Sequence, residues 1–169
     1  MLVAATLLTS CDTAQAFFML QISGFAPGTA LPRDYQSNRN GCRGLNMSPP
    51  LRWSNPPSAT RFFAITEHRA SRGDTDPDLL WLVLAIPGNV RMLPYGAGSM
   101  LNSPANVGGA SRYRAWCPAA GDTEAIVFTV HALRDTVDVR ARYGSLSELR
   151  AAIADVRIDS ASVTAYVHR

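Results

Sequence analysis

The sequence contains no lysine, and charged residues occupy only 17% of its 169 positions. All sixteen basic side chains are therefore arginines, which reflects either an arginine-biased codon usage or an anion-binding surface. Nucleic-acid binding needs a concentrated basic footprint with aromatic residues or a known motif. The arginines are scattered instead, so we expect no nucleic-acid partner. Those up to residue 114 are Arg33, Arg39, Arg43, Arg52, Arg61, Arg69, Arg72, Arg91, Arg112 and Arg114.

The sequence also lacks the residue spacings that hold metal ions. Its three cysteines form no C-x-x-C pair, and its three histidines, His68, His131 and His168, do not pair at ligand spacing. Residues 74–78 alternate carboxylates as a calcium loop does, but the glycine and the bidentate glutamate that such a loop needs are replaced by Leu79 and Ala85. The sequence predicts no metal and no cofactor.

No set of catalytic residues stands out either. Residues 109–113 approach the nucleophile elbow G-x-S-x-G of serine hydrolases, but they lack the final glycine and a preceding strand. An enzyme would need an acid, a base and a nucleophile in convergent positions. We therefore expect a protein that is not an enzyme, and keep an uncharacterised hydrolase only as an alternative.

The composition is that of one globular domain rich in strands. Hydrophobic residues make up 47% of the chain, and eleven prolines and twelve glycines indicate many turns. The run at 79–86 is almost wholly apolar, which predicts a central strand buried on both faces. The predicted strands are rich in β-branched and aromatic residues and lie at 17–22, 61–67, 79–86, 125–133 and 161–167.

One segment near the C-terminus favours a helix. Ser145 and Glu148 form a capping-box pattern, with Ser145 as the N-cap and Glu148 reaching back to it. An apolar stripe at helical spacing follows, made of Leu149, Ala152, Ile153 and Val156. We expect this stripe to pack on the sheet just before the last strand.

The first sixteen residues are typical of an export leader. Leu8-Thr9-Ser10-Cys11 has the form of a bacterial lipobox with Cys11 as the lipidation site, and 14–16 is a competing small-x-small cleavage site. The apolar run is far shorter than the roughly 20 residues of a membrane-spanning helix. We expect a leader at 1–16, a mature domain at 17–169, and a periplasmic or lipid-anchored location in a bacterial envelope. The alternative is a frayed N-terminal segment.

The cysteine count fits export. If Cys11 carries lipid or is removed, Cys42 and Cys117 remain as a pair that an oxidising compartment can join. Two buried free thiols are the alternative.

An ordered series of motifs resembles the phosphatidylethanolamine-binding protein family, and within it the bacterial Raf-kinase-inhibitor-like proteins. Residues 40–42 and 46–53 are similar to the family's N-G-C and N-x-S-P-x-L-x-W, and residues 58–66 to A-G-T-x-S-F-A-L-T. Residues 81–87 resemble W-V-V-x-N-I-P, and residues 128–133 resemble F-T-V-Y-A-L. The match runs in order from about residue 19 to residue 166.

This resemblance implies an antiparallel β-sandwich of a large and a small sheet with few peripheral helices. It also implies a shallow pocket for an anionic headgroup, to which Trp81, Tyr113 and Pro118 would contribute. The family's D-P-D-x-P loop aligns with residues 69–73, so its carboxylates and prolines are lost. Arg69 stands where the family has an aspartate, and Arg72 adds a second positive charge to the loop.

Two further changes make the expected pocket apolar. The family's pocket histidine aligns with Leu80, and a proline of the family aligns with Trp116. The resemblance therefore implies a degenerate pocket with an apolar wall and an arginine rim, suited to a small anionic or amphipathic molecule.

Two non-catalytic functions compete on this basis. The first is a binding protein for such a ligand, and the second is a scaffold for a protein partner, as in kinase or protease inhibition. An open, lined pocket around Leu80 and Tyr113 favours the ligand, whereas a filled pocket with an exposed apolar patch favours the partner.

Overall fold

The computed structural model describes residues 16–70, 76–99, 112–138, 141 and 143–169. Residues 1–15 of the predicted leader, which include Cys11, lie outside the described residues, as do the predicted rim residue Arg72 and Ser111 of the elbow-like motif. No helix in the described part of the chain is long and apolar enough to cross a membrane.

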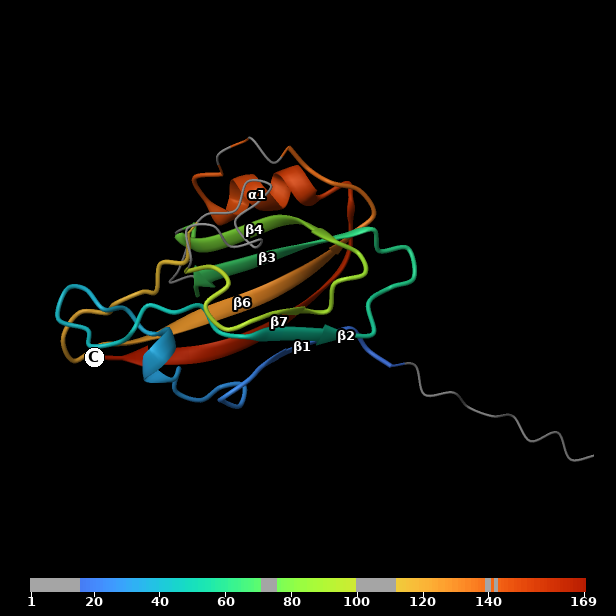
Figure 1. Ribbon diagram of the computed structural model, residues 1–169. Helices are drawn as coiled ribbons and strands as arrows, with labels where there is room; N and C mark the ends of the chain where they lie inside the picture. The colour runs from blue at the N-terminus through green and yellow to red at the C-terminus, as the bar shows by residue number, and fades with distance from the viewer. Residues whose placement is uncertain (1–15, 71–75, 100–111, 139–140, 142) are drawn as a thin grey trace, which may run out of the picture.

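Two antiparallel sheets form the molecule (Figure 1), which confirms the predicted mainly-β sandwich. The large sheet has the order β4-β3-β6-β7, with β3 at Phe62–Arg69, β4 at Leu79–Pro87, β6 at Thr123–Leu133 and β7 at Arg157–His168. The small sheet has the order β1-β2-β5, with β1 at Met19–Ile22, β2 at Leu51–Ser54 and β5 at Met92–Leu93.

The prediction of a central position for residues 79–86 is wrong. Strand β4 is at an edge of the large sheet, although both of its faces are buried as predicted. Trp81 and Val83 face the core between the sheets, while Leu82 and Leu84 face the helix. An apolar run indicates that both faces of a strand are covered, but it does not indicate whether the strand has a neighbour on one side or on both.

Sequence reasoning missed β2 and β5. Strand β2 alternates buried and exposed side chains, but it has only four residues and follows a long stretch rich in glycine, proline and asparagine. Strand β5 has two residues. Such short segments carry too few alternations to be separated from irregular structure.

The main core fills the space between the two sheets. Trp53 of β2 packs edge-on against Phe63 of β3, with ring centroids 5.3 Å apart. Ile65, Phe128 and Val130 are fully buried around them. Each fully buried aliphatic or phenyl side chain contributes roughly 1.5–3 kcal/mol, so this layer supplies most of the free energy that holds the small sheet on the large one.

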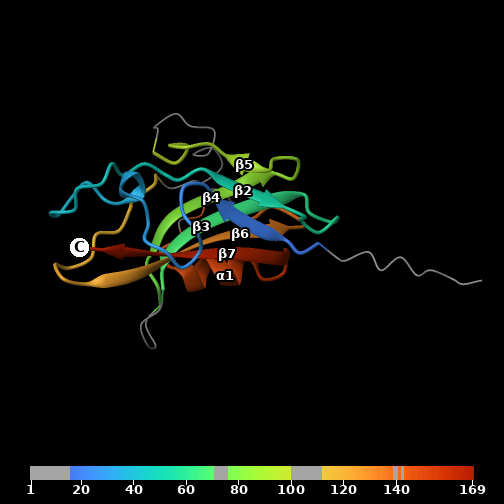
Figure 2. The same ribbon diagram turned by 90° about the horizontal axis from the view of Figure 1, so that it is seen from below.

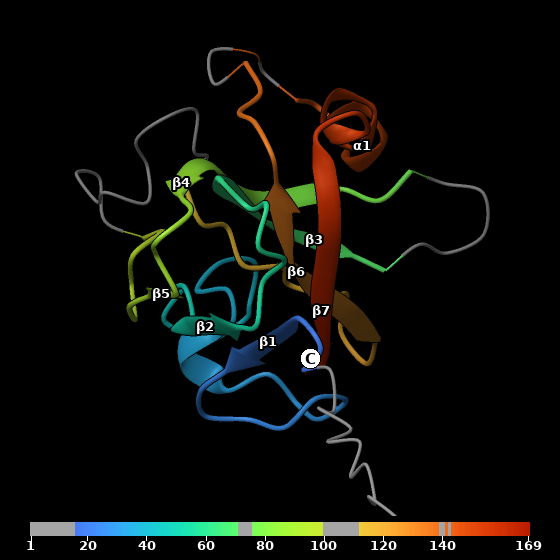
Figure 3. The same ribbon diagram turned by 90° about the vertical axis from the view of Figure 1, so that its right-hand side faces the viewer.

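Helix α1, Leu146–Ile153, covers the opposite face of the large sheet (Figures 2 and 3). Ser145 is the N-cap as predicted and accepts a hydrogen bond from the Glu148 amide. The Glu148 carboxylate accepts from the amide of Gly144, one residue before the predicted partner, at 2.7 Å. The cap thus satisfies a backbone donor just outside the helix.

The predicted apolar stripe of α1 is correct except at one position. Leu149 and Ile153 are fully buried against Ala64, Leu82 and Leu84. Leu146 completes the buried face, and Val156 packs at its margin just after the helix. Ala152 is exposed, because the sheet covers a narrower arc of the helix than the spacing rule allows.

Leu149→Ala should lower the free energy of unfolding by roughly 2–5 kcal/mol, because it leaves a cavity at a fully buried site. Ala152→Ser, at the exposed position of the same helix, should change it by less than about 0.5 kcal/mol. Urea denaturation of both variants measures this. Equal effects of the two changes would contradict the packing of α1 described above.

Candidate functional site

An open pocket of about 630 Å³ lies between two loops and the start of β4. One loop supplies residues 37–40 and Asn46, and the other supplies residues 112–117. Leu79 and Leu80 of β4 form the floor between them. These loops are far apart in the sequence, so the pocket exists only in the folded chain.

A β-bulge turns Leu80 toward this pocket. In the pairing of β3 with β4, Glu67 lies opposite Trp81 and His68 lies opposite Leu79, so Leu80 is the extra residue. Leu80 therefore packs toward the core between the sheets, on the same side as Trp81. Bulges commonly re-aim a side chain beside a functional site.

Aromatic residues form the wall of the pocket next to Leu80. The buried Tyr113 packs edge-on against Trp81, with ring centroids 5.5 Å apart, and its hydroxyl donates to the Tyr35 carbonyl at 2.7 Å. Trp116 is half-buried and also lines the pocket. The side chain of Asn46 accepts a hydrogen bond from the Ala115 amide at 3.0 Å, which fixes this wall to the opposite loop.

Arg69 braces this wall from behind. Its Nε and Nη2 donate to the Glu124 carboxylate at 2.9 and 3.1 Å, and its Nη1 donates to Asp78 at 2.9 Å. Its guanidinium also stacks over the Trp116 ring, 4.1 Å from the centroid. The fork of Arg69 is thus committed to protein carboxylates, and Arg69 does not line the pocket.

Three other arginines supply the cationic rim. Arg39 comes from the first loop, and Arg112 and Arg114 come from the second; all three are exposed. Asp78 is the one acidic residue among the described lining residues, and it is paired with Arg69. The rim therefore has an excess of positive charge, which sequence reasoning missed because the three arginines are 75 positions apart in the chain at the widest (114 minus 39).

The remaining predicted site residues lie next to the pocket. Trp81 is fully buried behind Tyr113. Pro118 is buried, and its carbonyl accepts from Arg169 at 3.4 Å.

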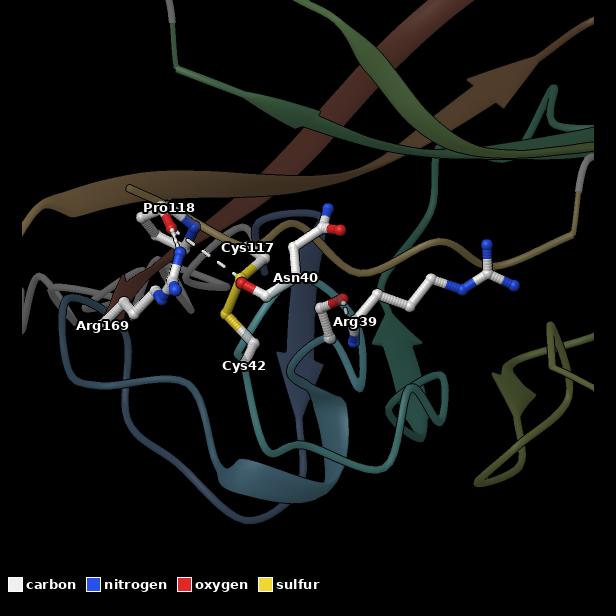
Figure 4. Close-up of a disulfide and its surroundings, with 7 residues drawn as sticks. Arg39, Asn40, Cys42, Cys117, Pro118 and Arg169 are labelled. Carbon is white, nitrogen blue, oxygen red and sulfur yellow. Dashed lines mark hydrogen bonds between the residues drawn. A yellow bond between two sulfur atoms is a disulfide. The ribbon is translucent and has the colours of Figure 1, made fainter. Parts of the chain in front are cut away.

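A disulfide joins Cys42 to Cys117, as the cysteine count suggested, with their Cα atoms 5.9 Å apart (Figure 4). It closes a loop across 75 positions. In the chain-entropy account a loop of this length stabilises the fold by roughly 4 kcal/mol.

The described carboxylates of the calcium-like segment and the histidine His131 are bonded within the protein. Asp76 accepts hydrogen bonds from the amide and hydroxyl of Ser147, and Asp78 binds Arg69. His131 is a buried residue of β6 bonded to the Thr66 hydroxyl, and burial lowers its pKa to about 3. No group of three potential metal ligands occurs among the described residues.

Glu67, which lies two residues before Arg69 on β3, has a fully buried carboxyl group. Trp81 and Phe128 flank it on the neighbouring strands. Its two oxygens have no hydrogen-bond partner within the described structure, and burial raises its pKa well above 4.5. Burial, and then the nearby Glu67, raise the pKa of Tyr113. Burial therefore favours the neutral form of Glu67 behind the aromatic wall, and no sequence signal marked this residue.

Known proteins are similar to this chain in sequence and in fold. A family model described as phosphatidylethanolamine-binding protein matches residues 21–168. The protein YbhB of Escherichia coli is 33% identical over 113 residues, which cover 63% of this chain and 72% of YbhB. The protein LppC of Mycobacterium tuberculosis, which carries a lipoprotein name, is 31% identical over 130 residues. That alignment covers 69% of this chain but little more than half of LppC, 56%.

Two crystal structures share the fold. Escherichia coli YbcL, titled a new member of the mammalian PEBP family, superposes with a TM-score of 0.76 at 24% identity, covering 91% of this chain and 99% of YbcL. The homologue CT736 of Chlamydia trachomatis superposes with a TM-score of 0.69 at 21% identity, covering 90% and 97%.

Glu67→Gln should remove one source of pH dependence in stability. Above pH 4.5 the unfolded chain releases the Glu67 proton while the folded chain retains it, so the native protein loses stability as the pH rises toward the raised pKa. In this window the free energy of unfolding of the Glu67→Gln variant should rise, relative to that of the native protein, by up to about 1.4 kcal/mol per pH unit. Denaturation of both proteins at pH 4 to 8 measures the gap; a gap independent of pH would refute the prediction.

Proposed function

The chain belongs to the phosphatidylethanolamine-binding protein family, and from this premise we propose that it is a non-catalytic binding protein for a small amphipathic anion. The ligand occupies the pocket between residues 37–46 and 112–117. Its charged end lies against Arg39, Arg112 and Arg114, and its apolar body lies against Leu80, Tyr113 and Trp116.

The observation that carries this proposal is that three arginines line the same pocket as an apolar and aromatic wall. The planar fork of arginine matches the geometry of phosphate and carboxylate. Pockets that combine apolar walls with a few polar groups are the usual sites of small ligands. The pocket is open with Trp116 on its wall, which favours a ligand over a protein partner.

Selectivity for an apolar body follows from Leu80 and Trp116. The bulge presents Leu80 at the position where the family resemblance has a histidine, so a hydrogen-bonding ring is exchanged for apolar surface. Stacking on Arg69 keeps Trp116 in place. Each buried methylene of a ligand adds about 0.8 kcal/mol, so an alkyl body should be favoured over free phosphate.

The described lining offers no catalytic set. It contains no histidine, Asp78 is paired with Arg69, and Cys117 is in the disulfide. Binding without chemistry is the function that these residues support best.

We also propose that the protein is exported and lipid-anchored through Cys11. The lipobox at 8–11, the Cys42–Cys117 disulfide and the lipoprotein name of the relative LppC support this. Disulfides persist in oxidising compartments.

Binding can be measured by calorimetry with inorganic phosphate, hexyl phosphate and hexanoate. Hexyl phosphate should bind at least about tenfold more tightly than phosphate, as expected from burying two methylenes. The double variant Arg112→Gln/Arg114→Gln should weaken both phosphates by roughly tenfold or more, through lost charge-assisted hydrogen bonds.

Two further variants separate the parts of the pocket. Trp116→Ala should weaken hexyl phosphate and leave phosphate unchanged, because the indole contacts only the apolar body. Arg134→Gln removes an exposed arginine away from the pocket and should change neither affinity. The proposed ligand class would be refuted if Arg134→Gln weakened binding as much as Arg112→Gln/Arg114→Gln does, or if none of the three probes bound.

Export can be measured by expressing the full chain in a bacterium and fractionating the cells. The protein should be in the envelope fraction and should partition into detergent, and Cys11→Ser should abolish that partition. A reduced protein found in the cytosol would contradict export.

A further inference from the structure

The loop that carries Arg39 has a firmly bonded base and a loosely bonded tip. At the base, the amides of Gly44, Asn46 and Met47 donate to the carbonyls of Ser37, Gln36 and Asp34 at 2.8 to 3.0 Å. The tip, residues 38–43, has one internal backbone hydrogen bond, from the Cys42 amide to the Arg39 carbonyl at 3.0 Å. Two more bonds join its ends to the base, from the Arg39 amide to the Ser37 hydroxyl at 3.2 Å and from Arg33 Nε to the Arg43 carbonyl at 2.6 Å.

The facing segment, which carries Arg112 and Arg114, is attached to the base of that loop. The Tyr113 hydroxyl donates to the Tyr35 carbonyl, and the Asn46 side chain bonds the backbone of Tyr113 and Ala115. These links lie below the tip and do not involve sulfur. The positions of Arg112 and Arg114 therefore depend on them, and not on the tip.

The disulfide is the strong connection between the tip and this facing segment. Cys42 is in the tip, and Cys117 lines the pocket (Figure 4). Within the described residues, the Cys117 sulfur also lies 3.7 Å from the Asn40 carbonyl oxygen, but a disulfide sulfur has no proton to donate, so this contact is weak.

Arg169 makes an additional bridge on the far side of the disulfide from Arg39 (Figure 4). It donates to the Pro118 carbonyl at 3.4 Å, and its guanidinium fills the space beside Gly41, where a Cβ would collide with it. Gly41 has φ +87°, a conformation that suits glycine. This contact is non-covalent, and it does not reach the pocket.

We propose that the Cys42–Cys117 disulfide positions Arg39 over the pocket and makes the affinity for an anionic ligand depend on the redox state of the protein. This proposal rests on the proposed function. With the disulfide formed, Arg39 faces Arg112 and Arg114, and the three arginines share one anion. With the disulfide reduced, the tip moves away from the pocket and only the two arginines of the facing segment remain.

The chemistry is ordinary thiol–disulfide exchange with a dithiol as the reductant. A thiolate of the dithiol attacks one sulfur of the pair and breaks the S–S bond, which gives a mixed disulfide. The second thiol of the dithiol resolves it, so the protein gains two electrons and two protons as two thiols, and the dithiol leaves as its own disulfide. Both cysteines are partly exposed, which permits this attack.

The test is a cycle that combines reduction with Arg39→Gln, with hexyl phosphate as the probe. In the oxidised protein, Arg39→Gln should weaken binding roughly tenfold, as for one charge-assisted hydrogen bond. Reduction by a dithiol should weaken binding of the native protein by a similar factor. In the reduced protein, Arg39→Gln should have no further effect, because the two changes remove the same contact.

The controls separate a local effect from unfolding. Cys42→Ser/Cys117→Ser should bind like the reduced protein and should not respond to the dithiol, and Arg169→Ala should still respond to it. Amide hydrogen exchange should accelerate at residues 38–41 on reduction and stay slow in β6. Additive losses in the cycle, unchanged affinity with both thiols free, or global unfolding on reduction would each overturn the proposal.

The outcomes also distinguish this inference from the proposed function. If the oxidised protein binds none of the probes, the proposed function fails, and the redox-dependent affinity fails with it. Exchange at residues 38–41 then still decides whether the disulfide positions the tip. If the oxidised protein binds hexyl phosphate and reduction changes nothing, the proposed function stands and only the redox dependence is wrong.

Discussion

The alternation of side chains along β3 is the constraint on which the rest of the structure depends. Successive residues of a strand point to opposite faces, so Phe63, Ile65, Glu67 and Arg69 all face the small sheet and the pocket. The first two belong to the core, the third is a buried acid, and the fourth braces the pocket wall. One strand therefore carries the transition from a packed core to a polar site within eight residues.

The ion pairs at the end of β3 keep Arg69 from reaching a ligand in the pocket. The Arg69 side chain is mostly buried beside the buried Glu124, and a buried charge requires a well-placed opposite charge. The Arg69 guanidinium and the Glu124 carboxylate are joined by two hydrogen bonds. Moving Arg69 toward a ligand would therefore leave the Glu124 carboxylate without its main cation. Arg69 thus acts through Trp116, and the anion is left to the exposed arginines of the two loops.

The pocket itself is a product of chain segments that have no local relation. Residues 37–46 and 112–117 meet because the sandwich brings both to the start of β4, and the disulfide then holds their outer parts together. The asparagine Asn46 holds their inner parts. The pocket is thus held at two levels, by Asn46 at the inner level and by the disulfide beside the tip that carries Arg39.

The sequence by itself determined the strands with strong β-branched and aromatic content, the capped helix, and the fold class through its ordered family motifs. It also suggested that Leu80 and Trp116 make the pocket apolar, because a substitution at an aligned position can be read without coordinates. It gave no indication of the bulge at Leu80, of the buried Glu67, or of which arginines surround the pocket. Those features depend on registers between strands and on contacts between residues as far as 78 positions apart. Only tertiary structure decides them, since local pattern carries no information about which distant segments pack together.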